Sequence, residues 1–380
     1  MLPRWYPNVI NPADGNFIER HIEAIGNLHP LELIFVKGLD TEPVNKIVKK
    51  VYLNNVEVHL RYFKNRTGMF SSVRNLTKYL IIQFKAYKEI SSRKGNPCIC
   101  HVHVMARTSL LACWLKLKYR VPFIVSEHWS GYYPSANKLS GVKKFFYSII
   151  FKYADQITAV SQSLGAELKK LSGNRDISII PNIVEEVFFT TDKEAVSSVD
   201  IKNIVHISNL HPEIKRVDKI IQAFKSIRKH HTDINLIIIG SGTAENELKS
   251  MVNQDEDLKD NVHFLGDIPP IEVANVLKTA WTTVLFSKFE TQSVVMLESI
   301  AMGVPVIAPE VGGISEHCEG RGILYKVNSL EAFTNSLDKM LIDNPKFRTS
   351  DLRAYAANKF KAEIVGASFI QEYDILKRPN

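Results

Sequence analysis

Short apolar runs alternate with amphipathic segments along the whole of this 380-residue chain. The apolar runs have the length of buried strands, and the amphipathic segments repeat their apolar residues at helical spacing. The alternation predicts strands at residues 31–36, 56–62, 98–105, 123–126, 203–207, 234–239, 281–286 and 304–308. Strands that alternate with helices favour an α/β fold with mostly parallel sheets. Because the chain is too long for one compact core, we expect two Rossmann-like domains with a ligand in the cleft between them.

Two predicted helices of the first half, 70–90 and 142–153, combine Lys or Arg with aromatic and aliphatic residues. An apolar stripe on such a helix either packs into its domain or rests on a membrane surface, and the sequence leaves both open. A polar, strand-poor stretch at residues 185–199 separates the two halves of the chain. We therefore place the first domain at residues 1–185 and the second at residues 186–362.

The charge is distributed unevenly between the two halves. Residues 1–183 hold 26 Lys and Arg against 12 Asp and Glu, a net charge of +14, and the remainder holds 22 against 28, a net charge of −6. A basic first half and an acidic second half indicate two surfaces with different partners. No nucleic-acid motif accompanies the net charge, so we do not expect nucleic-acid binding.

The sequence also lacks the usual signals of a membrane span, a secretory leader and a metal centre. No apolar run approaches the roughly eighteen residues of a spanning helix, and the N-terminus has no signal-peptide core. No second Cys/His pair has the spacing of metal ligands. We therefore expect a cytoplasmic protein with reduced thiols and with no metal or cofactor. The four cysteines are Cys98, Cys100, Cys113 and Cys318.

The stretch from Phe286 to Glu316 carries the clearest chemistry. It predicts a strand end, a polar loop, a short helix from Ser293 to Met302 with Ser293 as N-cap, and a second strand. The unpaired amides and partial positive charge at the start of this helix suit a phosphate or diphosphate. Glu290 in the loop and Glu298 in the helix could then accept hydrogen bonds from hydroxyl groups on either side. Hydroxyl groups on both sides of a diphosphate describe a nucleotide sugar.

This stretch resembles the signature of the retaining glycosyltransferases of family 4, or group 1, of the bacterial surface-polysaccharide type. The resemblance rests on the E-x7-E spacing of Glu290 and Glu298, on Gly-Val-Pro-Val at 303–306 and on Gly-Gly-Ile-x-Glu at 312–316. It covers essentially the whole chain. It implies the GT-B fold, in which two Rossmann-like domains face each other across a cleft, and sugar transfer from a nucleotide sugar with retention at the anomeric carbon. It also implies that a C-terminal helix, residues 363–380, packs back on the first domain.

The same resemblance suggests roles for individual residues. Lys215 matches the lysine of the donor diphosphate, and His128 matches a histidine that contacts the donor sugar. Glu290 would position that sugar, so Lys215, His128 and Glu290 are the expected catalytic residues. The family often has Arg where Asn209 stands, and whether Arg216 replaces that cation stays open. The expected donor-binding residues are Gly15, Asn209, Arg216, Asp267, Ile268, Thr291, Gln292, Ser293, Val294 and Glu298.

Two histidines of the predicted strand at 98–105, His101 and His103, lie inside an apolar run, and we expect a structural role for both. Gly15 would let the backbone approach the donor phosphates, and an ordinary turn glycine is the alternative at that position. Backbone groups at Asp267 and Ile268 would hold the nucleotide base.

In resembling enzymes the first domain holds the acceptor, which is often a lipid-linked sugar at the cytoplasmic leaflet. The expected partners are a nucleotide-sugar donor, a sugar or lipid-linked acceptor and, through the basic helices, an anionic membrane surface. The resemblance implies a hexosyl- or N-acetylhexosaminyl-transferase. Two other functions stay open: a nucleotide-sugar epimerase on the same fold, and a non-catalytic nucleotide-sugar-binding protein. Two departures from the family allow the non-catalytic binding protein: Asn209 stands where the family often has Arg, and Thr291-Gln292 stand where it more commonly has small or aromatic residues. The sequence does not name the base, the sugar or the acceptor.

Overall fold

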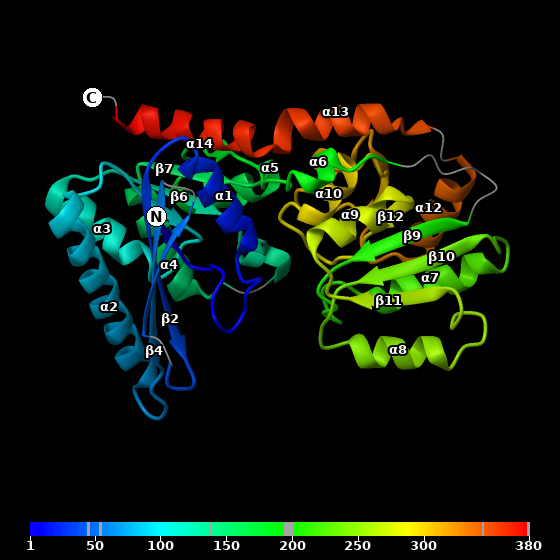
Figure 1. The fold of residues 1–380 in the computed structure, drawn as a ribbon, viewed down its shortest axis with the longest axis horizontal. Helices are drawn as coiled ribbons and strands as arrows, with labels where there is room; N and C mark the ends of the chain where they lie inside the picture. Colours follow the sequence, from blue (N-terminus) through cyan, green and yellow to red (C-terminus); the bar gives the residue numbers. More distant parts are fainter. Residues whose placement is uncertain (44–45, 53–54, 137–138, 194–200, 344–345, 378–380) are drawn as a thin grey trace. The chain divides into compact units, whose positions relative to one another are not determined.

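The structure is a computed structural model, and it describes all residues except 44–45, 53–54, 137–138, 194–200, 344–345 and 378–380 (Figure 1). The chain forms two compact units. Unit 1 comprises Met1–Asn182 and Ala362–Asn380, and unit 2 comprises Ile183–Lys361. The predicted linker at 185–199 contains the short helix α6 (Val187–Thr190), and its residues 194–200 lie outside the described part of the chain.

Unit 1 has a parallel sheet in the order β1-β5-β6-β7-β8 and a smaller sheet in the order β2-β4-β3. Only β3 runs antiparallel to its neighbour. Strand β1 has two residues and pairs with β5, and the amide of Ile34 in β2 donates to the carbonyl of Met1 at 3.0 Å. Strand β1 therefore lies where the two sheets adjoin. The strands are β1 (Leu2–Pro3), β2 (Leu31–Leu39), β3 (Ile47–Tyr52), β4 (Val56–Lys64), β5 (Cys100–His103), β6 (Phe123–Glu127), β7 (Gln156–Ala159) and β8 (Ser178–Ile179).

Strand β3 was not predicted, because two adjacent lysines interrupt its apolar alternation. Lysine is common on edge strands, where it discourages pairing with other chains, so the polar composition hides the strand from a periodicity argument. The two helices predicted at 70–90 and 142–153 start and end within a few residues of those bounds. The α-helices of the first part of unit 1 are α1 (Asn16–Gly26), α2 (Ser71–Lys94), α3 (Ser109–Tyr119), α4 (Gly141–Tyr153) and α5 (Gln162–Ser172).

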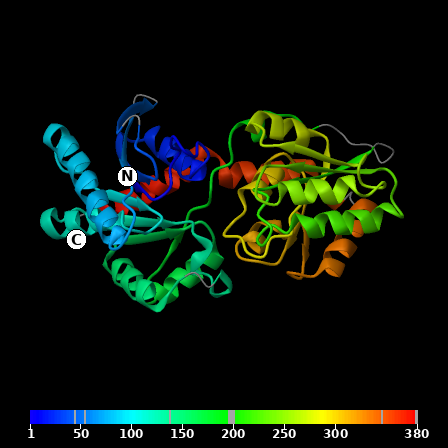
Figure 2. The same cartoon turned by 90° about the horizontal axis from the view of Figure 1, so that it is seen from below.

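The last helix, α14 (Ala362–Lys377), packs beside α1 within unit 1 (Figure 2). Gly366 allows the close approach, since a Cβ there would lie 2.9 Å from the carbonyl oxygen of Ala24. Phe369 of α14 is buried, and the hydroxyl of Tyr373 lies 2.5 Å from Nδ1 of His101. The helix is separated from α13 (Thr349–Phe360) of unit 2 by Lys361, whose backbone is extended.

Unit 2 has one sheet of six strands in the order β11-β10-β9-β12-β13-β14, and every neighbouring pair is parallel. The chain starts at β9, moves to β10 and β11 on one side, and then crosses to β12 on the other side. In open parallel sheets, the carboxyl ends of two strands between which the order reverses form the usual ligand site. The strands are β9 (Lys202–Ile207), β10 (Ile234–Ile239), β11 (Val262–Gly266), β12 (Ala280–Val284), β13 (Val306–Pro309) and β14 (Gly322–Tyr325).

Helices cover both faces of this sheet, and each face has its own apolar cluster. One cluster contains Phe224 and Phe333, and the other contains Met296 and Phe360. The helices are α7 (Val217–Arg228), α8 (Glu245–Asn253), α9 (Pro270–Lys278), α10 (Val294–Ala301), α11 (Ile314–Cys318) and α12 (Leu330–Asp343), with α6 and α13. No helix among the described residues is long and apolar enough to cross a membrane.

Candidate active site

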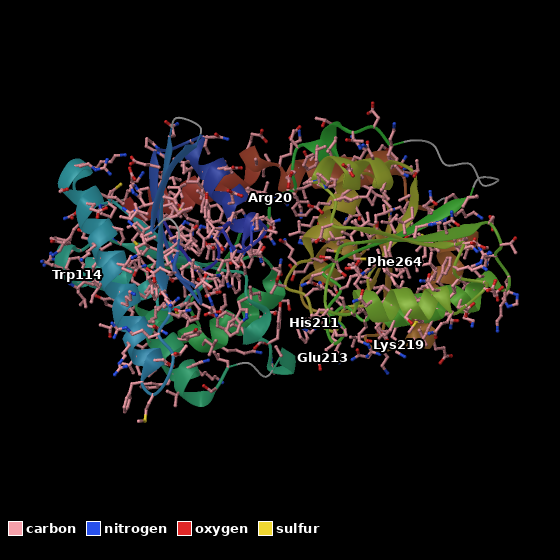
Figure 3. All side chains as sticks on the ribbon, turned by 60° about the horizontal axis from the view of Figure 1, so that its bottom comes forward. Arg20, Trp114, His211, Glu213, Lys219 and Phe264 are labelled. Atoms are coloured by element: carbon pink, nitrogen blue, oxygen red, sulfur yellow. The ribbon has the colours of Figure 1, made fainter. Side chains whose placement is uncertain are left out.

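The reversal point of unit 2 lies between β9 and β12, and the loops after these two strands meet there. The loop after β9, marked by His211 and Glu213 in Figure 3, is joined to the loop after β12 by a hydrogen bond from the amide of Lys288 to the carbonyl of Ile214, 2.9 Å long. Across the same junction, Nζ of Lys215 lies 2.5 Å from Oε1 of Glu290. The structure therefore brings together two of the three expected catalytic residues.

Lys215 and Glu290 are half-buried, with 21% and 13% of their side chains exposed, and their charges neutralise each other. The hydroxyl of Ser287 donates to the same carboxylate oxygen at 2.9 Å. A bound diphosphate would offer Lys215 a stronger partner and free Glu290 to accept from sugar hydroxyls. The pair thus places a cation and a carboxylate together at the junction of the two loops.

His206, at the end of β9, is a residue of this site that the sequence did not suggest. Its Nδ1 lies 2.8 Å from the carbonyl of Val284 in β12, and its Nε2 lies 2.8 Å from the hydroxyl of Ser208. Burial lowers the pKa of His206 to about 4, so the imidazole is neutral at physiological pH. It therefore bridges the two strands at the reversal point. A histidine within an apolar run carries no signal that would distinguish this role.

Helix α10 begins beside this junction. Within the described residues, the amides of Ser293, Val294 and Val295 have no acceptor within hydrogen-bonding distance. Ser293 occupies the N-cap position as predicted, but its side chain does not cap the helix, and its φ of 57° lies in the left-handed region. A non-glycine residue in that region is strained, and such strain concentrates at ligand sites. The start of α10 therefore presents free amides, and anion binding there stays a prediction.

The side chain of Gln292 points away from this opening. It is fully buried, and its Nε2 lies 3.1 Å from Nε2 of His317 in α11. The preceding carbonyl, that of Thr291, accepts from the amide of Gly313 at 3.2 Å. These bonds place Thr291 and Gln292 as supports of the loop. A contact between Gln292 and a donor would therefore have to use its backbone amide.

Glu298 lies inside α10 and is only 7% exposed. If it holds a ribose hydroxyl, replacing it by Ala should raise the Kd for the free nucleoside diphosphate by about tenfold, the usual effect of losing one hydrogen bond to a charged group. Isothermal titration measures this Kd. The exposed Glu272 of α9, replaced by Ala, is the matched control. An unchanged Kd in a Glu298→Ala protein that folds normally would remove Glu298 from the site.

A second cation for the donor could stand at position 209, where the family often has Arg, or could be Arg216. The structure gives Asn209 and Arg216 different surroundings. Arg216 makes two hydrogen bonds of 3.1 Å to the carboxylate of Asp218, and this contact raises its pKa. Its charge is thus already compensated. Asn209 is exposed, and its carbonyl accepts from the amide of His211 at 2.6 Å. Lys215 is therefore the cation of this loop that faces the junction.

Asp267 and Ile268 follow β11 at the same carboxyl edge, and the hydroxyl of Ser241 donates to the Asp267 carboxylate.

The two glycines of the Gly-x-Gly turn at 240–242 are explained by close backbone packing. A Cβ on Gly240 would lie 1.9 Å from the carbonyl oxygen of Ser208, and one on Gly242 would lie 2.7 Å from the amide nitrogen of Leu210. These glycines let the loop after β10 press against the loop after β9.

In unit 1, His128 follows β6 at the carboxyl edge of the parallel sheet and is 7% exposed. It lies beside His21 and His103, with ring centroids 5.3 and 5.8 Å away, and ligand nitrogens of the three rings lie within 4.8 Å of one another. Burial lowers the pKa of all three, so they are neutral and have the protonation state of metal ligands. The sequence did not predict this cluster, because its members are far apart along the chain.

Two histidines of β5 have different surroundings. His101 contacts the hydroxyls of Tyr373 and Ser126, at 2.5 and 2.7 Å, which is a structural arrangement. His103 is fully buried, and neither ring nitrogen has a hydrogen-bond partner among the described residues.

Gly15 has a left-handed backbone conformation, with a φ of 72°, and a Cβ there would lie 2.6 Å from the backbone of Trp5. Gly15 is therefore required by the fold, whatever it does for a donor.

Glu127, which precedes His128, is fully buried, and burial raises its pKa to about 7. Its Oε1 accepts from the amide of Met105 and from the hydroxyl of Tyr132, both at 2.7 Å. The contact to Met105 holds the segment between β5 and α3, in which Val104 has a φ of 61°. Glu127 thus positions the start of α3, a role that the sequence did not indicate.

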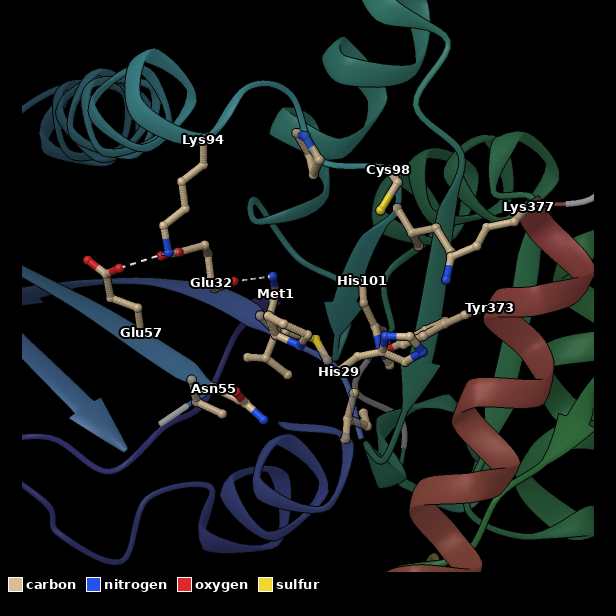
Figure 4. Close-up of a pocket in the computed structure, with 16 residues that line it drawn as sticks. Met1, His29, Glu32, Asn55, Glu57, Lys94, Cys98, His101, Tyr373 and Lys377 are labelled. Carbon is tan, nitrogen blue, oxygen red and sulfur yellow. Dashed lines mark hydrogen bonds and ion pairs between the residues drawn. The ribbon is translucent and has the colours of Figure 1, made fainter. Parts of the chain in front are cut away.

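A cavity of about 370 Å³ lies at the other edge of the unit 1 strands, near Cys98 and the start of β2 (Figure 4). Lys94 reaches across it to the carboxylates of Glu32 and Glu57, the second at 3.0 Å. His59 lies 2.8 Å from Glu32. These charged groups satisfy one another, so we assign no ligand to this cavity.

Comparison with known proteins is consistent with this geometry. The model of Glycosyltransferase Family 4 matches residues 53–187, and the model of Glycosyl transferases group 1 matches residues 188–359. The chain is 29% identical over 355 residues to N-acetyl-alpha-D-glucosaminyl L-malate synthase of Bacillus anthracis, covering 88% of this chain and 87% of the relative. It is 24% identical over 357 residues to the putative teichuronic acid biosynthesis glycosyltransferase TuaC of Bacillus subtilis, covering 88% and 86%.

Solved structures share the fold. Sucrose-phosphate synthase from Thermosynechococcus elongatus superposes with a TM-score of 0.76 at 18% identity, covering 95% of this chain and 92% of that chain. Anabaena Alr3699/HepE in complex with UDP gives 0.66 at 17% identity, covering 83% and 86%. These likenesses show that the two units form the GT-B fold. The two family matches, which together span residues 53–359, show that the chain belongs to the family 4, group 1 glycosyltransferases.

Proposed function

We propose that the chain transfers a hexosyl or N-acetylhexosaminyl group, with retention at the anomeric carbon, from a nucleotide sugar to a sugar or lipid-linked acceptor. The process served is the synthesis of cell-surface polysaccharide or glycoconjugate. The observation that carries the proposal is the Lys215–Glu290 pair at the reversal point, next to the open start of α10. A cation, free amides and a carboxylate are the groups that a diphosphate joined to a sugar requires.

In this mechanism the donor diphosphate displaces Glu290 from Lys215. Lys215 and the amides of Ser293 to Val295 stabilise the negative charge that develops on the leaving diphosphate, an effect of the oxyanion-hole type. Glu290 then positions the sugar through its hydroxyls, and the resemblance gives His128 a contact to the same sugar. No residue is assigned as a covalent nucleophile; Glu290 is the nearest candidate, and we give it the positioning role.

The relatives suggest where the search for a donor should begin. Alr3699/HepE has been solved with UDP and with UDP-glucose, and one relative is named for N-acetylglucosaminyl transfer to L-malate. Uridine diphosphate sugars, with glucose and N-acetylglucosamine first, are therefore the first donors to test.

The test of the proposed function is donor hydrolysis without acceptor across a panel of nucleotide sugars. We expect slow release of nucleoside diphosphate from one or a few donors, with the released sugar initially in the α configuration if the donor is an α-linked UDP-sugar. Binding without any turnover would support the non-catalytic alternative. Conversion of the donor to its epimer would support the epimerase.

We propose that this reaction needs no metal, because Lys215 and the helix amides would supply the positive charge that the leaving diphosphate requires. Hydrolysis rates should stay within about twofold when the purified protein is treated with EDTA and dialysed, since these protein groups supply the charge stabilisation. A protein treated identically without chelator is the control. A large loss that Zn²⁺ restores would overturn the proposal and direct attention to His21, His103 and His128.

A cytoplasmic location at the inner face of the membrane is also part of the proposal. Helix α4 exposes an apolar stripe, and its only fully buried side chain is Phe151. At about 100° per residue the side chains of the stripe, Val142, Phe145, Phe146 and Ile149, share one face of the helix, and Lys143 and Lys152 flank that face. The apolar face of α4 is thus turned outward rather than into the core, which supports a role for α4 as a helix that lies at a membrane interface. The stripe is Val142 (70% exposed), Phe145 (63%), Phe146 (58%) and Ile149 (48%).

We expect the protein to cosediment with anionic vesicles and to dissociate as salt rises past about 0.15 M, where the screening length is about 8 Å. Replacing Lys143, Lys144 and Lys152 by Gln should weaken binding, since each basic residue near an anionic surface contributes about 1 kcal/mol. Replacing Phe145 and Phe146 by Ser should weaken it by an independent route. A protein that ignores anionic vesicles at low salt would end the membrane proposal and leave the transferase intact.

A further inference from the structure

An open cavity of about 770 Å³ lies at the carboxyl ends of several strands of unit 1. Residues that follow β1, β4 and β5 line it, together with the end of β2. One wall is the first part of α2, and another includes Tyr147 of α4. The carboxyl edge of a parallel sheet is the usual place for a ligand, and this edge belongs to the unit that would hold the acceptor.

The lining of this cavity is strongly basic. It contains Arg4, Lys37, Arg66 and Arg107 and a single acid, Asp40. Lys37 is paired with Asp14 at 3.1 Å. Within the described residues, none of the three arginines has a carboxylate within 4.0 Å, and Asp40 accepts from Asn65 at 3.3 Å. Among the residues that the structure describes, the three guanidinium groups of this cavity therefore make no ion pair, and Asp40 is the one carboxylate among the residues that line it.

Two of the three arginines, Arg4 and Arg107, lie against aromatic rings. The guanidinium of Arg4 lies 5.1 Å from the ring of Trp5 and 5.2 Å from that of Trp129, and its buried NH1 has no hydrogen-bond partner. The guanidinium of Arg107 lies 4.0 Å from the ring of Tyr79. Burial lowers the pKa of Arg107, and the charge of Arg4 lowers it further. Like charges fixed near each other in this way are relieved by an anion that bonds to both.

The start of α3 faces the same cavity. Ala106, Arg107 and Thr108 line it, and their amides have no acceptor among the described residues. The hydroxyl of Thr108 is also unpartnered, although the residue is only 2% exposed. Helix α3 has eleven residues, so its dipole adds positive potential at this end. An unsatisfied buried hydroxyl beside free helix amides is a second sign of a missing ligand, independent of the arginines.

We propose that this cavity, which we call the α3 anion pocket, binds the phosphate or diphosphate of a phosphorylated acceptor. The inference rests on the proposed transferase function and names the substrate class of its acceptor side. Three guanidinium groups, three amides and a hydroxyl exceed what one carboxylate can accept, whereas a phosphate or diphosphate offers more oxygens.

The surroundings of the pocket admit either a lipid-linked or a water-soluble source of this phosphate. The first turn of α2 beside the pocket exposes Phe70 and Val73, and the exposed Phe146 of α4 precedes Tyr147 in the pocket wall. A lipid diphosphate would place its phosphates in the pocket and its chain along these apolar side chains. A sugar phosphate would use the pocket alone.

The test is titration with inorganic pyrophosphate, followed by calorimetry, in a Lys215→Ala background that removes the cation of the donor site. The parent should bind, and the addition of Arg107→Gln should raise the Kd about tenfold or more, as for loss of a charge-assisted contact. Arg120→Gln is the matched control, because Arg120 follows the opposite end of α3 and the charge change is the same. Its Kd should stay within about twofold of the parent.

Thr108→Val separates a ligand contact from a structural role. The hydroxyl has no partner in the folded protein, so its removal should leave the Tm unchanged or raised while the Kd for pyrophosphate rises. A lowered Tm with an unchanged Kd would overturn the assignment of Thr108. Absence of pyrophosphate binding to the parent, or equal Kd values for the Arg107 and Arg120 variants, would overturn the pocket itself. Neither result depends on donor hydrolysis, so the two proposals fail separately.

A second titration distinguishes the two sources of phosphate. Farnesyl diphosphate should bind more tightly than pyrophosphate if the acceptor is lipid-linked, and Phe70→Ser with Phe146→Ser should remove that difference. Equal affinities for farnesyl diphosphate, pyrophosphate and glucose 1-phosphate would assign the pocket to a water-soluble phosphorylated acceptor.

Discussion

Replacing Lys215 by Ala should lower kcat/KM about a hundredfold or more, the effect of losing one strong donor to a developing negative charge. Lys215 is paired with Glu290 at 2.5 Å, and no other basic side chain of its loop contacts that carboxylate among the described residues. Arg216, the nearest in sequence, is bonded twice to Asp218. The structure therefore leaves Lys215 without an evident substitute for the donor diphosphate.

Steady-state kinetics on the donor that the hydrolysis panel identifies would measure this effect. Lys219→Ala is the matched control, because Lys219 lies on α7 a few residues away and its ammonium contacts Gln222 at 2.8 Å (Figure 3). That variant should keep its turnover. If the Lys215 variant stays within about threefold of the parent, another cation stabilises the leaving group, and Arg216 released from Asp218 is the first to examine.

Gly240→Ala should lower the free energy of unfolding by roughly 3 kcal/mol or more, because two penalties combine there. Gly240 has a φ of 116°, where side chains are strained, and its added Cβ would lie 1.9 Å from the carbonyl oxygen of Ser208. That oxygen belongs to backbone and cannot rotate aside. The loop after β9, which carries Lys215, would have to move, so donor binding should weaken together with stability.

Gly320→Ala separates strain from collision. Gly320 also has a positive φ, 74°, but a Cβ there would meet nothing within 4 Å. The expected loss is about 1–2 kcal/mol, the cost of the left-handed conformation alone. Urea denaturation of the two variants beside the parent measures both values. If the Gly240 variant is no less stable than the Gly320 variant, the loops after β9 and β10 are not pressed together as the structure shows.

The elements that follow from local pattern could be predicted from the sequence. The strand at 234–239 was predicted at its observed bounds, and the helix at 142–153 differs from α4 by one residue at its start. Glu290 and Glu298 could be placed on a loop and a helix because their separation lies within one strand–loop–helix unit. Periodicity, caps and glycines act over a few residues, so the sequence expresses them directly.

The groups that meet across the fold depended on tertiary structure. Lys215 and Glu290 are 75 residues apart, and only the parallel pairing of β9 with β12 brings their loops together. The same holds for His21, His103 and His128, and for the arginines of the α3 anion pocket, which follow separate strands. The outward direction of the α4 stripe was likewise undecided, since an apolar face looks the same in sequence whether it is buried or exposed. The neighbouring residues in the sequence set the backbone conformation of a residue. The pairing and order of the strands decide which distant side chains become its partners.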